Sequence, residues 1–465
     1  MRKLWLATLA LSVVLAGGCG SAGGNGGATG ETNPGNGAPP AQTPDNGNPP
    51  QTAPEQPGAG NGAPSGNGGN AGNNGAQTPP AENGNAGSDE PPPQTPAQPT
   101  AEELLAQRVA KMTLDEKLGE MLIAGLEGTT ASAQTKRMIQ EQHVGGFIFY
   151  KNNVTTPAGV AAYVNQLKAW NKANPAPLFI SVDQEGGRVS RLPGLLKIPP
   201  ARTIGDTGDA AYAGQIGTAL GKASKLMGFN VDFAPVLDIN SNPKNPVIGD
   251  RSFGTTSKRV TDMGLSVLES IRGQGVVPVV KHFPGHGDTS VDSHLELPVV
   301  NKTLAQLKAF EWVPFKAAVE DGADMVMVAH ILFPKIDPAH PASLSKTIIT
   351  DELRGELGFQ GVVITDDMTM GAISEHFGLA QAAVTSVKAG SDIILLAHGY
   401  DDAKTVVGAL KQAVQKGSIT QKRIDESVTR ILALKQRYKL SDAAIPAKPD
   451  VSGVNAIIQK AVSAH

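Results

Sequence analysis

The residues of this chain that can do chemistry are concentrated between Lys281 and His294. This short stretch contains three histidines and two aspartates. Pro284 and the glycines beside it exclude a regular helix, so we expect a loop. The imidazole of His294 can give and take a proton near neutral pH, and Asp292, two residues earlier, can accept a hydrogen bond from the ring. That hydrogen bond would fix the tautomer of the ring, so the pair suits general acid/base chemistry.

Other charged side chains follow directly after short apolar runs. Asp366 and Asp367 follow the run 361–365. Polar groups of the same kind lie at the ends of three further runs or in the loops after them, at 183–188, 250–251 and 281–282. If these runs are parallel strands of one barrel, their carboxyl ends meet at one face, which is where barrel enzymes carry their active sites.

The elements that would position these side chains are eight apolar runs separated by helical patterns. The helical patterns include 158–173, 258–272, 304–321 and 403–415, and Thr113 with Glu116 forms a capping box before another. Eight strand-then-helix units predict an α/β fold, a TIM-like (β/α)₈ barrel over 101–440. An open doubly wound sheet is the alternative, but no dinucleotide-binding glycine fingerprint follows the first run. The apolar runs cover 121–126, 146–150, 178–183, 231–237, 276–283, 325–331, 361–365 and 392–397.

The segment 281–294, Lys-His-Phe-Pro-Gly-His-Gly-Asp-Thr-Ser-Val-Asp-Ser-His, resembles the signature of the β-N-acetylglucosaminidases of glycoside hydrolase family 3. Those enzymes use an Asp–His pair on a mobile loop as acid/base. The segment 364–368, Ile-Thr-Asp-Asp-Met, is similar to the family's nucleophile motif, and 183–191 is similar to its sugar-binding segment Asp-X-Glu-Gly-Gly-Arg-Val-X-Arg. The resemblance extends over essentially all of 101–440.

The resemblance implies the role of each matching residue. Asp366 would be the nucleophile, and His294 with Asp292 would be the acid/base pair. The implied activity is retaining exo-hydrolysis of terminal β-linked N-acetylglucosamine through a glycosyl-enzyme, with peptidoglycan fragments as the expected source. The implied sugar-binding residues are Asp183, Arg191, Arg251, Lys281 and His282.

Other functions fit parts of the pattern. His282 and His286 have the spacing of zinc ligands on a helix, but Pro284 and the neighbouring glycines remove that helix, so we expect no metal and no other cofactor. A β-N-acetylglucosaminide phosphorylase is closely related, because a histidine acid/base does not repel phosphate. A glycan-binding lipoprotein is the alternative from another class, although it would need neither Asp366 nor the Asp292–His294 pair.

Several nearby residues have structural interpretations. His286 is expected to hold the loop, and Asp367 to cap a helix. Lys281 can pair with Asp183 or Asp366 at the barrel mouth. His330 follows the sixth run, where function is plausible, but it belongs to no motif that we can name.

The first residues have the pattern of an export signal. Arg2 and Lys3 precede an apolar run at 4–15, which is too short to span a bilayer, and small residues at 16–18 complete a signal peptide over 1–18. Cys19, the only cysteine, resembles the lipidated cysteine of bacterial lipoproteins, although Ala16 stands where that pattern usually has Leu. We therefore expect the chain outside the cytoplasm, anchored to the outer face of the membrane or secreted.

Segment 19–100 comprises Cys19 and a linker made almost wholly of Gly, Pro, Asn and other small or polar residues. From 20 to 100 it has no aromatic residue and no Val, Ile, Leu or Met, so it cannot bury enough apolar surface to fold, and we expect disorder. After the barrel, 441–465 is a tail with an amphipathic stretch at 454–462.

The charge of the body excludes one class of partner. Two of the 40 basic residues and six of the 43 acidic ones precede residue 101, which leaves 38 basic and 37 acidic residues in 101–465. A near-neutral body gives no electrostatic case for binding nucleic acid. The expected partners are a β-GlcNAc-containing oligosaccharide or muropeptide and, through Cys19, the membrane; we expect a monomer.

Overall fold

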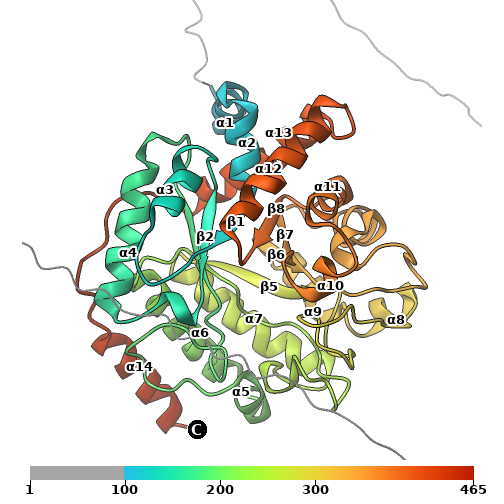
Figure 1. Cartoon of the computed structure of the whole chain (residues 1–465). Coiled ribbons are helices and arrows are strands. Elements are labelled where there is room, and N and C mark those ends of the chain that lie inside the picture. Colours follow the sequence, from blue (N-terminus) through green and yellow to red (C-terminus); the bar gives the residue numbers. More distant parts are fainter. Residues whose placement is uncertain (1–98) are drawn as a thin grey trace, which may run out of the picture. The chain divides into compact units, whose positions relative to one another are not determined.

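The computed structural model describes residues 99–465, and their centre is a closed parallel barrel of eight strands in sequential order (Figure 1). This confirms the predicted (β/α)₈ fold. The last strand pairs with the first, with Leu122 opposite Ile394 and Ala124 opposite Leu396. The strands are β1 (Leu122–Gly125), β2 (Gly146–Phe149), β3 (Phe179–Val182), β4 (Val231–Asp232), β5 (Val277–Phe283), β6 (Met325–Val328), β7 (Val362–Asp367) and β8 (Ile393–Leu396).

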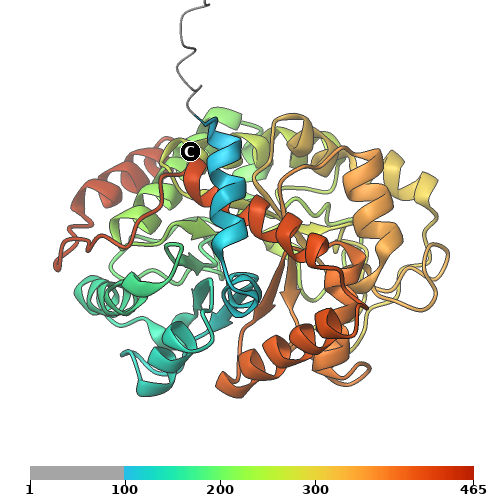
Figure 2. The same cartoon turned by 90° about the horizontal axis from the view of Figure 1, so that it is seen from above.

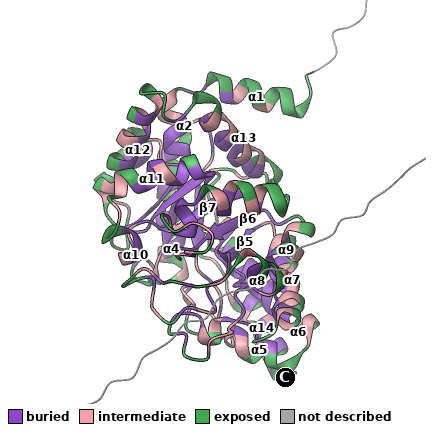
Figure 3. Ribbon diagram, turned by 90° about the vertical axis from the view of Figure 1, so that its right-hand side faces the viewer, coloured by how far each residue is buried: buried purple, intermediate pink, exposed green. Residues whose placement is uncertain are grey.

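Nearly every strand residue is buried, as Figure 3 shows for the centre of the barrel. Strands covered on both faces have no polar side to present to water, which is why they are almost continuously apolar in sequence. The fourth strand is much shorter than the predicted 231–237. Pro235 has no N–H to donate to a neighbouring strand, so regular pairing ends after Asp232.

Helices surround the barrel (Figures 1 and 2), and their buried apolar residues belong to the same core as the strands. The predicted capping box is present at the start of α2, where Thr113 and Glu116 exchange hydrogen bonds with each other's backbone. The helices are α1 (Ala101–Lys111), α2 (Leu114–Glu120), α3 (Ala133–Gln140), α4 (Pro157–Trp170), α5 (Ala201–Thr207), α6 (Ala210–Leu226), α7 (Ser257–Gly273), α8 (Leu304–Ala309), α9 (Val313–Glu320), α10 (Gly371–Ser374), α11 (Leu379–Ala389), α12 (Tyr400–Gln415), α13 (Gln421–Arg437) and α14 (Ser452–Ser463). Shorter 3₁₀ turns occur at Lys151–Asn153, Asn171–Ala173, Gly249–Arg251 and Ala342–Leu344, and a π-helical segment covers Thr347–Glu356.

The helix predicted over 304–321 is wrong as a single element. The structure divides it into α8 and α9. Pro314 lies in the first turn of α9, where its missing N–H breaks no hydrogen bond. In a continuous helix over 304–321 it would lie in the interior and remove a hydrogen bond, so the helix is interrupted before it. The break leaves Glu311 between the two helices, and its carboxylate pairs with Lys302.

The tail after α13 returns along the outside of the barrel, and α14 lies beside α6 (Figure 1). Asn455 of α14 joins it to the loop that follows β3, since its side chain accepts from the Leu196 amide at 2.8 Å and donates to the Gly194 carbonyl at 2.9 Å. The predicted signal peptide, the lipidated Cys19 and the linker up to residue 98 lie outside the described part of the chain, while Thr100, the last residue of the predicted linker, caps α1. Within residues 99–465, no helix has the length and hydropathy needed to cross a membrane.

Candidate active site

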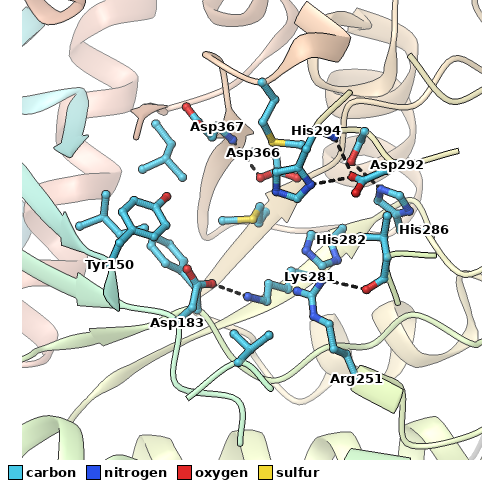
Figure 4. Close-up of a pocket in the computed structure, with 18 of the residues that line it drawn as sticks. Tyr150, Asp183, Arg251, Lys281, His282, His286, Asp292, His294, Asp366 and Asp367 are labelled. Atoms are coloured by element: carbon cyan, nitrogen blue, oxygen red, sulfur yellow. Dashed lines mark hydrogen bonds and ion pairs between the residues drawn. The ribbon is translucent and has the colours of Figure 1, made fainter. Parts of the chain in front are cut away.

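A pocket of about 340 Å³ lies at the carboxyl ends of the barrel strands. This is the size of a small-ligand site and the face at which barrel enzymes act. Figure 4 shows the side chains that converge on it from several strands. All eight residues that the sequence assigns to catalysis or sugar binding line this one pocket: Asp183, Arg191, Arg251, Lys281, His282, Asp292, His294 and Asp366.

One side of the pocket is a network of charges that are buried or half-buried. The ammonium of Lys281 lies 2.6 Å from a carboxylate oxygen of Asp183 and 2.7 Å from one of Glu185. Glu185 also receives two hydrogen bonds from the guanidinium of Arg251, at 2.8 and 2.9 Å. Burial alone would raise the pKa of Glu185, but Arg251 and Lys281 together lower it. Lys281 therefore pairs with Asp183, one of its two expected partners, and Glu185 joins the two cations.

Replacing Glu185 with Gln removes the charge that both cations share. Because Lys281 is buried and Arg251 is mostly shielded from water, we expect Glu185→Gln to lower the free energy of unfolding by roughly 3 kcal/mol. Urea denaturation would show this as a lower midpoint with an unchanged slope. The matched control is Glu426→Gln, whose carboxylate is exposed and 3.9 Å from Lys422, with an expected change of at most about 0.5 kcal/mol. Equal midpoints for the two variants would contradict the assigned network.

Arg191 is held in the pocket through its backbone, and its guanidinium remains available. The buried side chain of Gln184 accepts hydrogen bonds from the amides of Arg191 and Leu192, at 2.8 and 3.0 Å. The Nε atom of Arg191 is buried and has no hydrogen-bond partner among the described residues. The guanidinium can therefore donate hydrogen bonds to a ligand in the pocket.

Asp366 presents an ionised carboxylate at the end of β7. Burial would raise its pKa, but the nearby imidazoles of His282 and His330 and the amide of Asp367 lower the pKa to about 2. The Asp367 amide donates to a carboxylate oxygen of Asp366 at 2.9 Å. An ionised carboxylate in this position has the charge that a nucleophile requires.

Asp367 does not cap a helix, so that prediction is wrong. Its carboxylate accepts hydrogen bonds from the amides of Thr369 and Ala397, at 3.0 and 2.8 Å. The next helix, α10, begins beyond that reach, with Met370 at its N-cap. Asp367 therefore ties the end of β7 to the end of β8.

Asp292 and His294 form a pair that also lines the pocket. Asp292 Oδ1 lies 2.7 Å from Nδ1 of His294 and also accepts from the His294 amide at 2.9 Å. Burial would raise the pKa of Asp292, but the hydrogen bonds from His294 lower it. With the Nδ1 proton directed at Asp292, Nε2 is free to exchange a proton with a ligand. Figure 4 shows His294 and Asp366 among the side chains that line the pocket.

Asp238 is a residue of this site that the motifs do not reveal. It is fully buried, and its carboxylate accepts from Nδ1 of His282 and from the His286 amide, both at 2.6 Å. Burial raises the pKa of Asp238, but the two histidines outweigh burial and lower it. Asp238 thus orients the ring of His282 toward the pocket. Its position directly after the predicted run 231–237 is the sequence signal that could have found it, because barrel enzymes carry functional side chains at strand ends.

His286 holds the loop from within. Its Nδ1 lies 2.9 Å from the Thr289 hydroxyl and its Nε2 lies 2.9 Å from the Ser293 hydroxyl. Burial lowers its pKa to about 4, so the ring is neutral. Among residues 99–465, no group of three or more His, Cys, Asp or Glu side chains is arranged to hold a metal ion.

Two further residues complete the site without belonging to a motif. Tyr150 follows β2 and lines the pocket, where its ring stacks on His398 with 5.5 Å between centroids. Burial, together with Asp183 and Asp367, raises the pKa of Tyr150, so the phenol stays a hydrogen-bond donor. His330 is buried beneath the pocket and lies 2.9 Å from the Asp367 carbonyl. Both residues follow barrel strands; the sequence already singled out His330 by that position, and the same signal could have found Tyr150.

The chain is similar to known proteins in both sequence and structure. The profile described as "Glycosyl hydrolase family 3 N terminal domain" matches residues 113–434. The chain is 34% identical over 343 residues to Beta-hexosaminidase A of Pseudoalteromonas piscicida, a match that covers 68% of this chain and 57% of that protein. It is also 34% identical over 328 residues to Beta-hexosaminidase LpqI of Mycobacterium tuberculosis, covering 69% of this chain and 82% of that protein.

A solved structure is similar over the same region. The glycoside hydrolase family 3 beta-N-acetylglucosaminidase from Paenibacillus sp. superposes with a TM-score of 0.72 at 42% identity. The match covers 75% of this chain and 68% of that one. The chain thus spans little more than half the length of one relative and larger shares of the other two.

Proposed function

Because the chain belongs to glycosyl hydrolase family 3, we propose that it is a retaining exo-β-N-acetylglucosaminidase that removes terminal β-linked GlcNAc. The proposal rests on one observation: the Asp366 carboxylate and the hydrogen-bonded Asp292–His294 pair line the same pocket. The names of the similar proteins, two beta-hexosaminidases and one beta-N-acetylglucosaminidase, support the sugar. The pocket has the volume for one sugar unit, which supports exo action.

In the first step, a carboxylate oxygen of Asp366 attacks the anomeric carbon while the bond from that carbon to the leaving oxygen breaks. The electron pair of the broken bond stays on the leaving oxygen, which takes the Nε2 proton of protonated His294. Asp292 accepts the Nδ1 hydrogen bond throughout and keeps the ring oriented. The result is a glycosyl-enzyme on Asp366.

In the second step, His294 removes a proton from a water molecule. The water oxygen bonds to the anomeric carbon, and the bond to Asp366 breaks with its electron pair returning to the carboxylate. Two inversions at one carbon leave the configuration of the sugar retained. The protonated imidazole and the ionised carboxylate are then ready for another cycle.

The charged side of the pocket is assigned to the sugar hydroxyls. Asp183, Lys281 and His282 can each bond a hydroxyl, and the unpaired Nε of Arg191 is a further donor. Arg251 has a less direct role, because its guanidinium is engaged by Glu185. Bonds that strengthen as the ring flattens favour the transition state over the bound substrate.

The test is release of nitrophenol from nitrophenyl β-N-acetylglucosaminide, with and without phosphate. We expect wild-type release that phosphate does not accelerate, with free GlcNAc as the product. Release that requires phosphate and yields the sugar 1-phosphate would make the chain a phosphorylase. If the folded protein releases sugar neither from this substrate nor from larger β-GlcNAc glycans, the chain would instead be a glycan-binding protein.

We place the enzyme outside the cytoplasm and held to the membrane by lipidated Cys19, with cell-wall fragments as the source of its substrate. The support is the export pattern in residues 1–18 and the composition of 20–100. Fractionation of cells that produce the full chain, and of cells that produce Cys19→Ser, tests the anchor. An equal share of both proteins in the membrane fraction would count against lipidation.

A further inference from the structure

The loop that carries the acid/base pair, residues 286–296, is fixed firmly at its base. Asp238 accepts from the His286 amide at 2.6 Å, and Asn245 donates to the His286 carbonyl at 2.8 Å. Lys302 adds an ion pair to Asp288 at 2.8 Å. These contacts end before His294, whose own side chain is 62% exposed. Nearer the tip, His286 Nε2 bonds the Ser293 hydroxyl and Asp292 bonds the imidazole itself, but both belong to the same loop, so a contact outside the loop is needed to place its tip.

The tip of the loop rests on the start of α10. The amide of Gly371 donates to the His294 carbonyl at 3.1 Å, and the amide of Ala372 donates to the Ser293 carbonyl at 3.2 Å. The first amides of a helix have no acceptor within the helix, so they must find one elsewhere. The loop carbonyls supply it. The acid/base loop thus caps the helix that follows the strand of Asp366.

This contact requires a residue without a side chain at position 371. A Cβ atom there would lie 2.6 Å from the Leu295 carbonyl oxygen and 2.8 Å from that of His294. Both are backbone atoms, so they cannot move aside as the end of a flexible side chain would. The backbone of Gly371 has an ordinary helical conformation that alanine also adopts, and alanine favours a helix by up to about 1 kcal/mol. Space, and not conformation, is therefore what the glycine provides.

We propose that Gly371 is a positioning residue for the acid/base chemistry. By admitting the loop carbonyls against the first amides of α10, it fixes the imidazole of His294 relative to Asp366. The two reacting groups are then placed by one short segment, because Asp366 and Gly371 belong to consecutive elements, β7 and α10. The inference rests on the proposed function and adds a residue to it that touches no substrate.

The experiment compares Gly371→Ala with Gly378→Ala. Position 378 precedes α11, where a Cβ atom would have no other atom within 4 Å and the backbone is not left-handed, so alanine there displaces nothing. The measured quantity is kcat/KM for an alkyl β-N-acetylglucosaminide, whose leaving group needs a proton, and for the dinitrophenyl glycoside, whose leaving group does not. Displacement of the acid by about 1 Å predicts a loss of roughly 10²-fold on the alkyl substrate for Gly371→Ala. The loss on the dinitrophenyl substrate should be at least about tenfold smaller, and Gly378→Ala should match wild type on both.

The ratio of the two rates does not depend on how much of the variant folds, so reduced stability alone cannot produce the expected result. A double-variant cycle gives a second test. When His294 is already replaced by Ala, adding Gly371→Ala should lower kcat/KM for the alkyl substrate little further. Hydrogen exchange of the wild-type amides gives a third test that needs no variant. The Gly371 and Ala372 amides are protected from exchange only while they donate to the loop carbonyls. Equal losses on both substrates, full additivity with His294→Ala, or unprotected amides would each overturn the proposal. Failure of the proposed function would look different, because wild type itself would then release no sugar.

Discussion

Asp366→Asn should abolish turnover while leaving the protein folded. The amide is nearly the same size as the carboxylate but has no charge and cannot form the glycosyl-enzyme. Loss of a nucleophile of this kind lowers kcat by roughly 10⁴-fold or more. The measurement is nitrophenol release under conditions that saturate the wild type. Since the pKa of Asp366 is lowered to about 2, its charge does not change over the working pH range, and the loss should be equally complete at every pH tested.

The control is Asp262→Asn, which changes the same groups on the surface of α7, where the carboxylate pairs with Lys258. Its kcat should match wild type. Thermal unfolding of both variants checks that folding is intact. Substantial turnover by folded Asp366→Asn protein would mean that another group attacks the anomeric carbon.

His294→Ala should have an effect that depends on the leaving group. Departure of a basic alkoxide needs a proton, so kcat/KM for an alkyl β-N-acetylglucosaminide should fall by roughly 10²–10⁴-fold. For the dinitrophenyl glycoside, whose leaving group is stable without a proton, we expect a loss of less than about tenfold, because kcat/KM reports the first step. Asp292→Asn should lower kcat/KM for both substrates by less than His294→Ala does, since it removes only the carboxylate that orients the ring.

The matched control is His376→Ala, at an exposed histidine outside the pocket, and it should leave both values unchanged. Equal losses on the two substrates would count against His294 as the acid. That pattern would point to a contribution to substrate binding instead, since binding affects good and poor leaving groups alike.

Much of the fold follows from periodicity and position. The eight apolar runs predict the strands because a parallel barrel buries both faces of each strand, and all eight occur in the structure. The prediction failed where proline changes the hydrogen bonding, at Pro235 beyond β4 and at Pro314 in the first turn of α9. Both residues were visible in the sequence, but an apolar or amphipathic pattern alone does not show where a missing N–H ends an element.

The site was predictable where residues lie close together in a motif, as in 281–294. The parts of the site that depend on contacts between distant segments of the chain could not be predicted. Asp238 orients His282 from 44 positions away, and the loop carbonyls at 293 and 294 meet the amides of Ala372 and Gly371. No local pattern encodes such contacts, because they exist only once the barrel brings successive strand ends together. Gly371 in particular looks like any other glycine until its neighbours are known.

The pairing of β1 with β8 has a consequence for the growing chain on the ribosome. β1 is made early, but its partner residues 394–396 emerge only near the end of synthesis. Until then the barrel is open along one side, and the strand that carries Asp366 has a neighbour on one edge only. Incomplete chains that stop before β8 therefore cannot form the catalytic pocket. The proposed activity therefore depends on translation through β8, because only then can the barrel close around the site.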